Sequence, residues 1–191
     1  MAKAATQVLE QPTRIAEWVK QAGIVIGASL FVALCAKITL PLPTPVPLTL
    51  QNFGVLMVGL LLGSRRGFAA LALYLIEGAC GLPVFNPAGP GGIAQIFGFT
   101  GGYLMAYPFV AFATGLIYEC SSRGFRSAVQ AGVAGEIVLF ACGLSWLAVL
   151  THSLSFAIKI GFYWFIFAEV IKVAMAATIA ERWNRKLRAR S

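Results

Sequence analysis

Long, uninterrupted runs of apolar residues alternate along the chain with short polar or charged segments. Runs of this length predict helices that span a membrane, whereas the strands of a transmembrane β-barrel would alternate apolar and polar residues. We therefore expect an all-α integral membrane protein with six transmembrane helices. Their predicted ranges are residues 22–40, 48–63, 68–82, 98–118, 128–150 and 158–179.

Two of the segments between these runs are unusual. Residues 41–47 contain four prolines, which cannot continue a helix and favour a stiff, extended chain. Residues 81–102 contain seven glycines and three prolines but no charged side chain. Irregular backbone is tolerated at membrane depth only where protein covers it or where it lines a cavity. We expect both segments to be ordered outer loops, joining helices 1–2 and 3–4 over a ligand cavity.

The second and third runs are short. They have about 16 residues each and so reach about 24 Å, whereas the apolar core of a bilayer is about 30 Å thick. These two helices should therefore leave room for another segment, for which residues 81–102 are the candidate.

Both ends of the chain are polar. Residues 1–20 combine charged groups with Ile15, Trp18 and Val19, which fits either a helix lying at the membrane interface or a frayed tail. Residues 21–181 are predicted to form one six-helix membrane domain, and residues 182–191 a basic cytoplasmic tail.

Composition and charge support this interpretation. Of the 191 residues, 59% are hydrophobic and 12% are charged, about half the charged fraction of a soluble domain. The formal net charge is +8, but the basic residues lie at the ends of apolar runs. We therefore expect contact with the lipid bilayer and no nucleic acid. An even number of spans with both termini in the cytoplasm places most basic residues on the cytoplasmic side, as the positive-inside rule requires.

Several kinds of chemistry are not expected. The four cysteines stand singly and the chain has one histidine, so we predict no metal site. There is no glycine-lysine motif for nucleotide phosphates, and no serine, histidine and acid set placed for catalysis. We therefore expect no enzyme, no ATPase activity in this chain and no cofactor. A membrane protein that binds a small molecule fits the pattern.

Glu169 and Lys172 are candidate ligand-binding residues because both lie inside the sixth apolar run. Three residues apart on a helix, they share one face and offer an acceptor and a donor. A charge inside a membrane is costly and usually faces a cavity, although a self-satisfying ion pair is the alternative. Glu77 and Glu136 are also expected inside the membrane, and for each a structural and a functional role stay open.

Polar and aromatic side chains near the outer side can complete such a site. Gln51 and Asn52 open the second run, where their amides can bond to a ligand or cap the helix. Phe85 and Tyr103 are aromatic residues that can pack an apolar ligand body. Others of this kind are Phe53, Phe97, Phe99, Tyr163 and Trp164.

The first run contains a candidate surface for a partner protein. Gly23 and Gly27 are four residues apart, as are Ser29 and Ala33. Small residues at this spacing allow another helix to approach closely. We expect these four residues to face a partner membrane protein.

Several motifs occur in fixed order in the first half of the chain. They read PVPLTLQ at 45–51, LLLGSRRG at 60–67, YLIEG at 74–78, GLPVF at 81–85 and GFTGGYL at 98–104. In these motifs the sequence resembles the BioY family, the biotin-specific substrate-binding (S) components of energy-coupling factor (ECF) transporters. The final helix resembles the family more loosely, with Glu169-x-x-Lys172 where the family usually has Asp-x-x-Lys. Phe99 replaces the usual proline of the last motif.

The resemblance implies six transmembrane helices in the cell membrane of a prokaryote and no catalytic activity. It implies that biotin is held near the outer side, beneath the loops joining helices 1–2 and 3–4. It also implies that transport requires an ECF transmembrane coupling protein and two ABC-type ATPases as partners. Asn86 falls where the family places polar residues that contact biotin.

The biotin head group suits the predicted polar pair. Glu169 can accept hydrogen bonds from the ureido ring, and Lys172 can donate to the ureido oxygen or pair with the carboxylate tail. Relative to an aspartate, the extra methylene of Glu169 should move its carboxylate by about 1 Å.

Three other functions stay open at this point. An S component for a different vitamin would share the fold, since a fold does not decide its ligand. A stand-alone secondary transporter could use Glu136 or Glu169 as a proton site, and an intramembrane enzyme could use Glu169 with Lys172. Dependence of uptake on ATPase partners would separate the S components from the secondary transporter, and a chemically unchanged ligand would argue against the enzyme.

Overall fold

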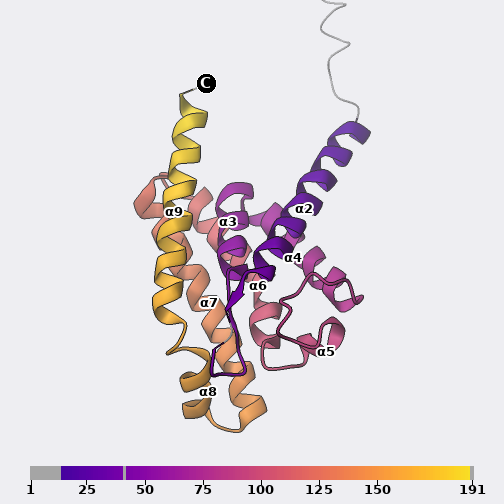
Figure 1. The fold of residues 1–191 in the computed structure, drawn as a ribbon. Coiled ribbons are helices and arrows are strands. Elements are labelled where there is room, and N and C mark those ends of the chain that lie inside the picture. The colour runs from indigo at the N-terminus through magenta and orange to yellow at the C-terminus, as the bar shows by residue number, and fades with distance from the viewer. Residues whose placement is uncertain (1–13, 41, 190–191) are drawn as a thin grey trace, which may run out of the picture.

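The computed structural model describes residues 14–40 and 42–189 and shows a predominantly helical protein (Figure 1). Within these residues there are eight helices and one pair of short strands, in agreement with the predicted all-α class. In chain order the elements are α2 (Arg14–Lys37), β1 (Thr39–Leu40), β2 (Leu48–Thr49), α3 (Gln51–Leu62), α4 (Ser64–Ala79), α5 (Gly92–Ile96), α6 (Gly101–Glu119), α7 (Phe125–Thr151), α8 (Leu154–Gly161) and α9 (Ile166–Arg188).

The proline-rich segment lies between the two strands. β1 and β2 pair in antiparallel fashion, with Thr39 opposite Thr49 and Leu40 opposite Leu48. The described residues between them contain no helix, as the prolines predicted. The strand pair thus closes the proline-rich segment into a hairpin-like loop.

α3 and α4 are joined by a single residue. Gly63 separates them, and its φ of 82° is a backbone angle that glycine adopts without strain. α4 already begins at Ser64, so the basic residues that follow belong to its first turn. The Glu119 carboxylate caps this turn, accepting from the Ser64 amide at 3.2 Å and from the Ser64 hydroxyl at 2.7 Å.

The glycine-rich segment contains more regular structure than its composition predicted. It includes the short helix α5, and α6 begins at Gly101 instead of residue 98. The remainder of the glycine-rich segment is irregular, as expected from its glycines and prolines.

α7 begins at Phe125, three residues before the predicted start of the fifth span.

The prediction of one continuous sixth helix is wrong. Two helices, α8 and α9, occupy this part of the chain and are bent by 52° at the break between them. Phe162 follows the end of α8, and its ring packs edge-on against Phe140 at a centroid distance of 4.9 Å. Packing of an aromatic side chain therefore accompanies the break.

Neither predicted terminal boundary coincides with the end of a helix. α2 continues through residue 20, where the predicted interfacial segment ends, and α9 continues through residue 182, where the predicted tail begins. Residues 1–13 of the predicted interfacial segment lie outside the described residues. The division into a segment at the interface, a membrane domain and a tail stays a prediction.

The described chain begins and ends at the same end of the molecule (Figure 1). The opposite end carries the proline-rich loop, α5 and α8. This arrangement is the one expected for an even number of crossings, with both ordered loops at one end. The assignment of the other end to the cytoplasm stays a prediction.

In the described part of the chain, three helices are long and apolar enough to cross a membrane. These are α2, α6 and α7, and the bent pair of α8 and α9 would be a fourth. α3 has 12 residues and α4 has 16, which correspond to about 18 and 24 Å. The predicted shortness of these two helices is confirmed, and the count of six spans stays a prediction.

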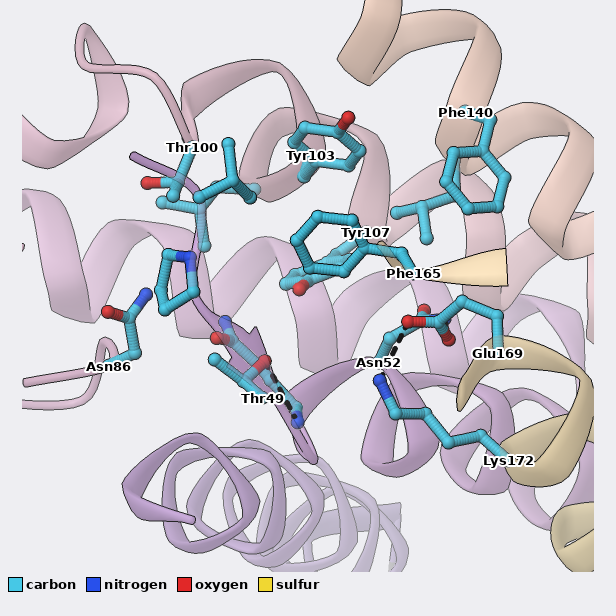
Figure 2. A pocket seen from close by; sticks show the side chains of 15 residues that line it. Thr49, Asn52, Asn86, Thr100, Tyr103, Tyr107, Phe140, Phe165, Glu169 and Lys172 are labelled. Atoms are coloured by element: carbon cyan, nitrogen blue, oxygen red, sulfur yellow. Dashed lines mark hydrogen bonds and ion pairs between the residues drawn. The ribbon is translucent and has the colours of Figure 1, made fainter. Parts of the chain in front are cut away.

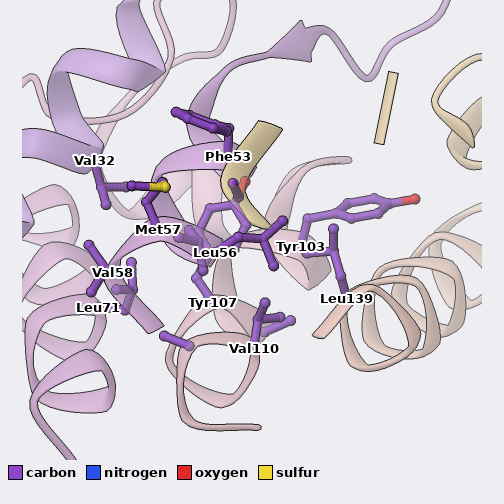
Figure 3. Packing of buried hydrophobic residues seen from close by; sticks show 14 of the residues in the cluster. Val32, Phe53, Leu56, Met57, Val58, Leu71, Tyr103, Tyr107, Val110 and Leu139 are labelled. Atoms are coloured by element: carbon purple, nitrogen blue, oxygen red, sulfur yellow. The ribbon is translucent and has the colours of Figure 1, made fainter. Parts of the chain in front are cut away.

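The core is built around α6, which packs against α3, α4 and α7. Leu56, Leu71 and Val110 are among its fully buried side chains (Figure 3). Glycine allows α3 to approach α6 closely, since a Cβ on Gly59 would collide with the backbone of Ala111. This packing fixes α3 and α6, whose outer ends carry polar residues.

Candidate functional site

A cavity of about 50 Å³ lies where α3, α6, α7 and α9 meet the two ordered loops (Figure 2). Both loops contribute to its wall, in agreement with the predicted cavity beneath them. The lining residues are Val46, Pro47, Thr49, Gln51, Asn52, Asn86, Thr100, Tyr103, Leu104, Tyr107, Leu139, Phe140, Phe165, Glu169 and Lys172.

Glu169 and Lys172 form an ion pair on α9, with 2.7 Å between Lys172 Nζ and Glu169 Oε1. Both residues line the cavity and are buried, with 5% and 6% of their surface exposed. Their spacing of three residues places them on one helix face, as predicted. An isolated charge buried in this way would be costly, and the ion pair offsets this desolvation for both residues.

Asn52 connects this ion pair to a second carboxylate. Its amide nitrogen donates to Glu169 Oε2 at 2.7 Å and to Glu136 Oε1 at 2.6 Å. The cluster therefore joins α3, α7 and α9, and it gives Glu136 a place beside the cavity that the sequence left open. We refer to Asn52, Glu136, Glu169 and Lys172 as the polar cluster.

Two buried acceptors of the polar cluster are unused. Asn52 Oδ1 and Glu136 Oε2 have no hydrogen-bond partner within the described residues. A buried acceptor without a donor costs about 1–3 kcal/mol. Of these two residues Asn52 lines the cavity, so this end of the cavity favours a molecule that brings N–H or O–H groups.

Gln51 lines the cavity, as predicted, but its side-chain nitrogen is bonded to the protein. This nitrogen donates to the Tyr74 hydroxyl at 2.7 Å, and that hydroxyl donates to the Val84 carbonyl at 3.0 Å. The relay runs from α3 through α4 to the glycine-rich segment. Gln51 therefore connects the cavity wall to the loop that covers it.

Tyr103 also lines the cavity, as predicted. Its hydroxyl donates to the Gly161 carbonyl at 2.9 Å, at the end of α8. Its ring packs against α7 at Gly143, where a Cβ would overlap the ring. The position of this aromatic wall is thus fixed by two neighbouring elements.

Asn86 lies at a neck between the cavity and a second hollow of about 290 Å³. This outer hollow lies between the two ordered loops, and Pro47 and Thr100 line both spaces as well. In Figure 2, Asn86 and Thr100 lie on the opposite side of the cavity from Glu169 and Lys172. The cavity therefore has polar groups at two ends with an apolar wall between them.

Phe85 lies outside the cavity lining, so the structure corrects its predicted place. Its ring packs edge-on against Tyr74, with 5.4 Å between the ring centroids, and covers Gly78. Four other aromatic candidates, Phe53, Phe97, Tyr163 and Trp164, also lie outside this lining, and Phe99 lines the outer hollow instead. The aromatic wall consists instead of Tyr103, Tyr107, Phe140 and Phe165.

The predicted partner surface on α2 is only half exposed. Gly23 and Gly27 are exposed, and nothing lies within 4 Å of the position that a Cβ would take on either. Ser29 and Ala33 are buried, and the Ser29 hydroxyl donates to the Glu77 carboxylate. These two residues pack within the chain, and Gly23 and Gly27 remain as the exposed part of the surface.

Several lining residues were not predicted. Tyr107, Phe140 and Phe165 lie within apolar runs, where hydropathy does not indicate which face meets a cavity. Thr49 and Thr100 had a usable signal, since they stand in the PVPLTLQ and GFTGGYL motifs.

No candidate metal site occurs in the residues that the structure describes. Across residues 14–40 and 42–189, histidine, cysteine and acidic side chains form no group of three or more that could hold a metal ion. The lack of a bound metal stays a prediction.

Comparison with known proteins gives one consistent result. The model of the BioY family matches residues 5–189. A protein of Thermotoga maritima named "Biotin transporter BioY" is 40% identical over 163 residues, which cover 84% of this chain and 95% of that protein. A "Probable biotin transporter BioY" of Pyrococcus horikoshii is 42% identical over 158 residues, covering 81% and 91%.

A solved structure agrees with these sequence matches. It is described as the crystal structure at 2.1 Å of the S-component for biotin from an ECF-type ABC transporter. Its TM-score with this chain is 0.79 at 27% identity, and the alignment covers 92% of this chain and 95% of that one. The likeness extends over nearly the whole fold.

Proposed function

Since the chain belongs to the BioY family, we propose that it is the membrane subunit that binds biotin for uptake into the cell. It is a multi-pass protein of the plasma membrane, as its apolar helices and its bacterial and archaeal relatives indicate. The observation that carries the ligand assignment is the buried polar cluster at one end of a cavity beneath two ordered loops.

The chemistry of the cavity matches that of biotin. Biotin has a ureido ring with one carbonyl and two N–H groups, an apolar bicycle and a carboxylate tail. Asn52 offers an unused acceptor and Glu169 its carboxylate oxygens for N–H groups, and Lys172 offers donors for the ureido oxygen. Tyr103, Tyr107 and Leu104 supply an apolar surface for the bicycle.

Charge favours one orientation of the ligand. Lys172 is already paired with Glu169 at 2.7 Å, so a carboxylate tail would find no unpaired positive charge in the polar cluster. The neutral ureido ring therefore suits the cluster, and the tail suits the neck at Asn86 and Thr100. The outer hollow beyond the neck is lined by uncharged residues that can accommodate the carboxylate with its water.

Glu169 is held by the protein more tightly than its longer side chain suggests. One carboxylate oxygen accepts from Lys172 and the other from Asn52. These two bonds can offset the freedom that the extra methylene brings relative to an aspartate. We assign Glu169, Lys172 and Asn52 to the ureido ring, Asn86 to the tail, and Gln51 and Tyr103 to the cavity wall.

Transport is proposed to require other proteins. The chain carries no glycine-lysine motif for nucleotide phosphates, so we propose that a transmembrane coupling protein and ABC-type ATPases supply the energy. The likeness to a solved S-component of an ECF-type ABC transporter supports this assembly. We further propose that biotin is released unchanged and that no cofactor takes part.

Calorimetric titration of biotin into the purified full chain in detergent tests the ligand assignment. Tight binding of one biotin per chain is expected, with thiamine and riboflavin as controls that do not bind. A well-folded sample that binds thiamine or riboflavin in place of biotin would contradict the assignment and point to a different vitamin.

A further inference from the structure

Four successive carbonyl oxygens of the glycine-rich segment accept hydrogen bonds from side chains instead of backbone groups. Lys37 Nζ donates to the Pro83 carbonyl and, at 3.1 Å, to the Phe85 carbonyl. The Val84 carbonyl accepts from Tyr74 at 3.0 Å, and the Asn86 carbonyl accepts from the amide of Gln95 at 3.5 Å. We call these four residues the 83–86 segment, and its position depends on three side chains.

The three donors differ in how readily their hydrogen bonds to these carbonyls can break. Tyr74 and Gln95 are buried, with 0% and 1% of their surface exposed. Lys37 is exposed at the last turn of α2. Water molecules can therefore take the place of the Pro83 and Phe85 carbonyls as hydrogen-bond partners of its ammonium group. A hydrogen bond to a charged donor is stronger than a neutral one, but exposure makes it exchangeable. Lys37 is therefore the donor that can release the Pro83 and Phe85 carbonyls without unpacking the core, while Tyr74 and Gln95 keep their bonds.

Loosening of the backbone at Pro83 and Phe85 would act on the cavity through the adjacent Asn86. Asn86 ends the segment and lines the neck between the cavity and the outer hollow. The cavity has a volume of about 50 Å³, whereas sites for small ligands have about 300–1,000 Å³. Part of the wall must move for a vitamin-sized molecule to enter, and the neck connects the cavity to the space outside.

We propose that Lys37 is a positioning residue that latches the 83–86 segment, and with it Asn86, over the bound ligand. The proposal rests on the proposed function, since the ligand is the one assigned above. Lys37 is not among the residues that line the cavity and acts through the carbonyls of Pro83 and Phe85. When the latch is open, the segment can move aside and the neck can widen.

The test compares neutral, conservative and control variants of the full chain. Lys37→Met removes the donor, Lys37→Gln shortens it to an uncharged amide, and Lys37→Arg keeps a charged donor that can reach two carbonyls. Lys159→Met is the matched control, because Lys159 is another exposed lysine at the loop end of the molecule. Two quantities are measured: the dissociation rate of labelled biotin in a chase experiment, and amide hydrogen exchange of residues 84–91.

The latch predicts that Lys37→Met and Lys37→Gln raise the dissociation rate about tenfold, with an association rate that is unchanged or higher. Amide exchange of residues 84–91 should rise with and without biotin, while exchange in α6 and α7 stays as in the parent chain. Lys37→Arg should restore both quantities, and Lys159→Met should leave both unchanged. A general loss of structure would instead raise exchange throughout and lower the amount of binding-competent protein.

Three results would overturn the latch. The first is a dissociation rate in Lys37→Met within twofold of the parent value, even where local exchange rises. The second is failure of Lys37→Arg to restore the slow rate, and the third is an equal effect of Lys159→Met. If the parent chain bound no biotin, the proposed function would fall, and unchanged exchange in the variants would then separately exclude the latch.

Discussion

The ion pair of Glu169 and Lys172 lies at the centre of the residues assigned to the ligand. Each charge is buried and offsets its desolvation with a close partner, so removing one partner leaves the other uncompensated. Such a loss typically costs about 3–5 kcal/mol. The pair is thus expected to contribute to the integrity of the fold as well as to binding.

Substitution Lys172→Met should weaken both stability and binding. We expect a lower midpoint of thermal unfolding in detergent, because Glu169 then lacks its charged partner. We also expect biotin affinity to fall about tenfold to a hundredfold, which corresponds to the loss of one hydrogen bond from a charged donor. Thermal unfolding followed by calorimetric titration measures the two effects on one sample.

The double variant Glu169→Gln with Lys172→Met separates the two roles. It removes both charges, so the unfolding midpoint should recover toward the parent value, while biotin affinity stays low because both ligand groups are gone. Parent-like affinity in either variant would contradict the assignment of this pair to the ligand. A double variant as unstable as the single one would contradict the charge argument.

The sequence predicted which single residues line the cavity better than it predicted the hydrogen bonds that connect them. A charge in an apolar run is unusual enough to single out Glu169 and Lys172 as cavity residues, and the resemblance to the BioY family pointed to Asn86. The bonds of Asn52 to Glu136 and Glu169 depend on how α3, α7 and α9 meet, which hydropathy does not encode. Phe85 was misplaced for the same reason, since its ring turns toward Tyr74 and away from the cavity.

Among the helices, the contact of α6 with α7 controls the aromatic wall of the cavity. Gly143 of α7 lies directly against the ring of Tyr103. Substitution Gly143→Ala should displace this ring and destabilise the chain by about 1–3 kcal/mol, as over-packing of a core does. Biotin affinity should fall as well, because Tyr103 lines the cavity. Thermal unfolding and titration provide the check.

Gly23→Ala is the matched control for this substitution. Gly23 also lies within a helix, but nothing is within 4 Å of the position of its Cβ. The control should keep parent-like affinity and an unfolding midpoint that is unchanged or slightly higher, because alanine favours helix. Equal behaviour of the two variants would show that the close approach of α6 and α7 does not determine the wall.

The ends of the helices were predicted where hydropathy changes sharply along the chain, and they were missed where it does not. Prolines predicted the loop between α2 and α3, and this part is non-helical in its described residues. The polar residues after Gly63 lie between two predicted spans, but they form the first turn of α4, because polar groups also suit the start of a helix. The break between α8 and α9 passes through four aromatic residues, 162–165, with no proline, glycine or charge among them, so the sequence offered no helix-breaking signal there.

At the scale of the whole molecule, the short α3 and α4 explain how loops can cover a membrane cavity. α3 has 12 residues and ends well short of the length that a bilayer core requires. The space beyond its outer end is occupied by the proline-rich loop and the glycine-rich segment, which together form the neck and the outer hollow. Length differences between helices thus create the room that the proposed ligand needs.

Two natural cysteines can test the orientation of the molecule. Cys80 follows α4 near the ordered loops, Cys120 follows α6 at the other end, and both are exposed. In chains that keep only one of them, a membrane-impermeant maleimide should label Cys80 in intact cells and Cys120 only after the cells are opened. The reverse pattern would contradict a cytoplasmic location of the chain ends.

The exposed glycines of α2 offer the final prediction, which concerns assembly. Gly23 and Gly27 leave a strip without side chains on a helix that also carries exposed apolar residues such as Ile26, Leu30 and Leu34. Because small residues let helices approach closely, Gly27→Leu should reduce co-purification with the coupling protein and ATPases while biotin affinity of the isolated chain stays unchanged. Leu30→Ala on the same helix, which removes bulk instead of adding it, is the control and should assemble normally. Normal assembly of Gly27→Leu would remove this strip as the partner surface, because a leucine side chain there would hold an approaching helix several ångströms away.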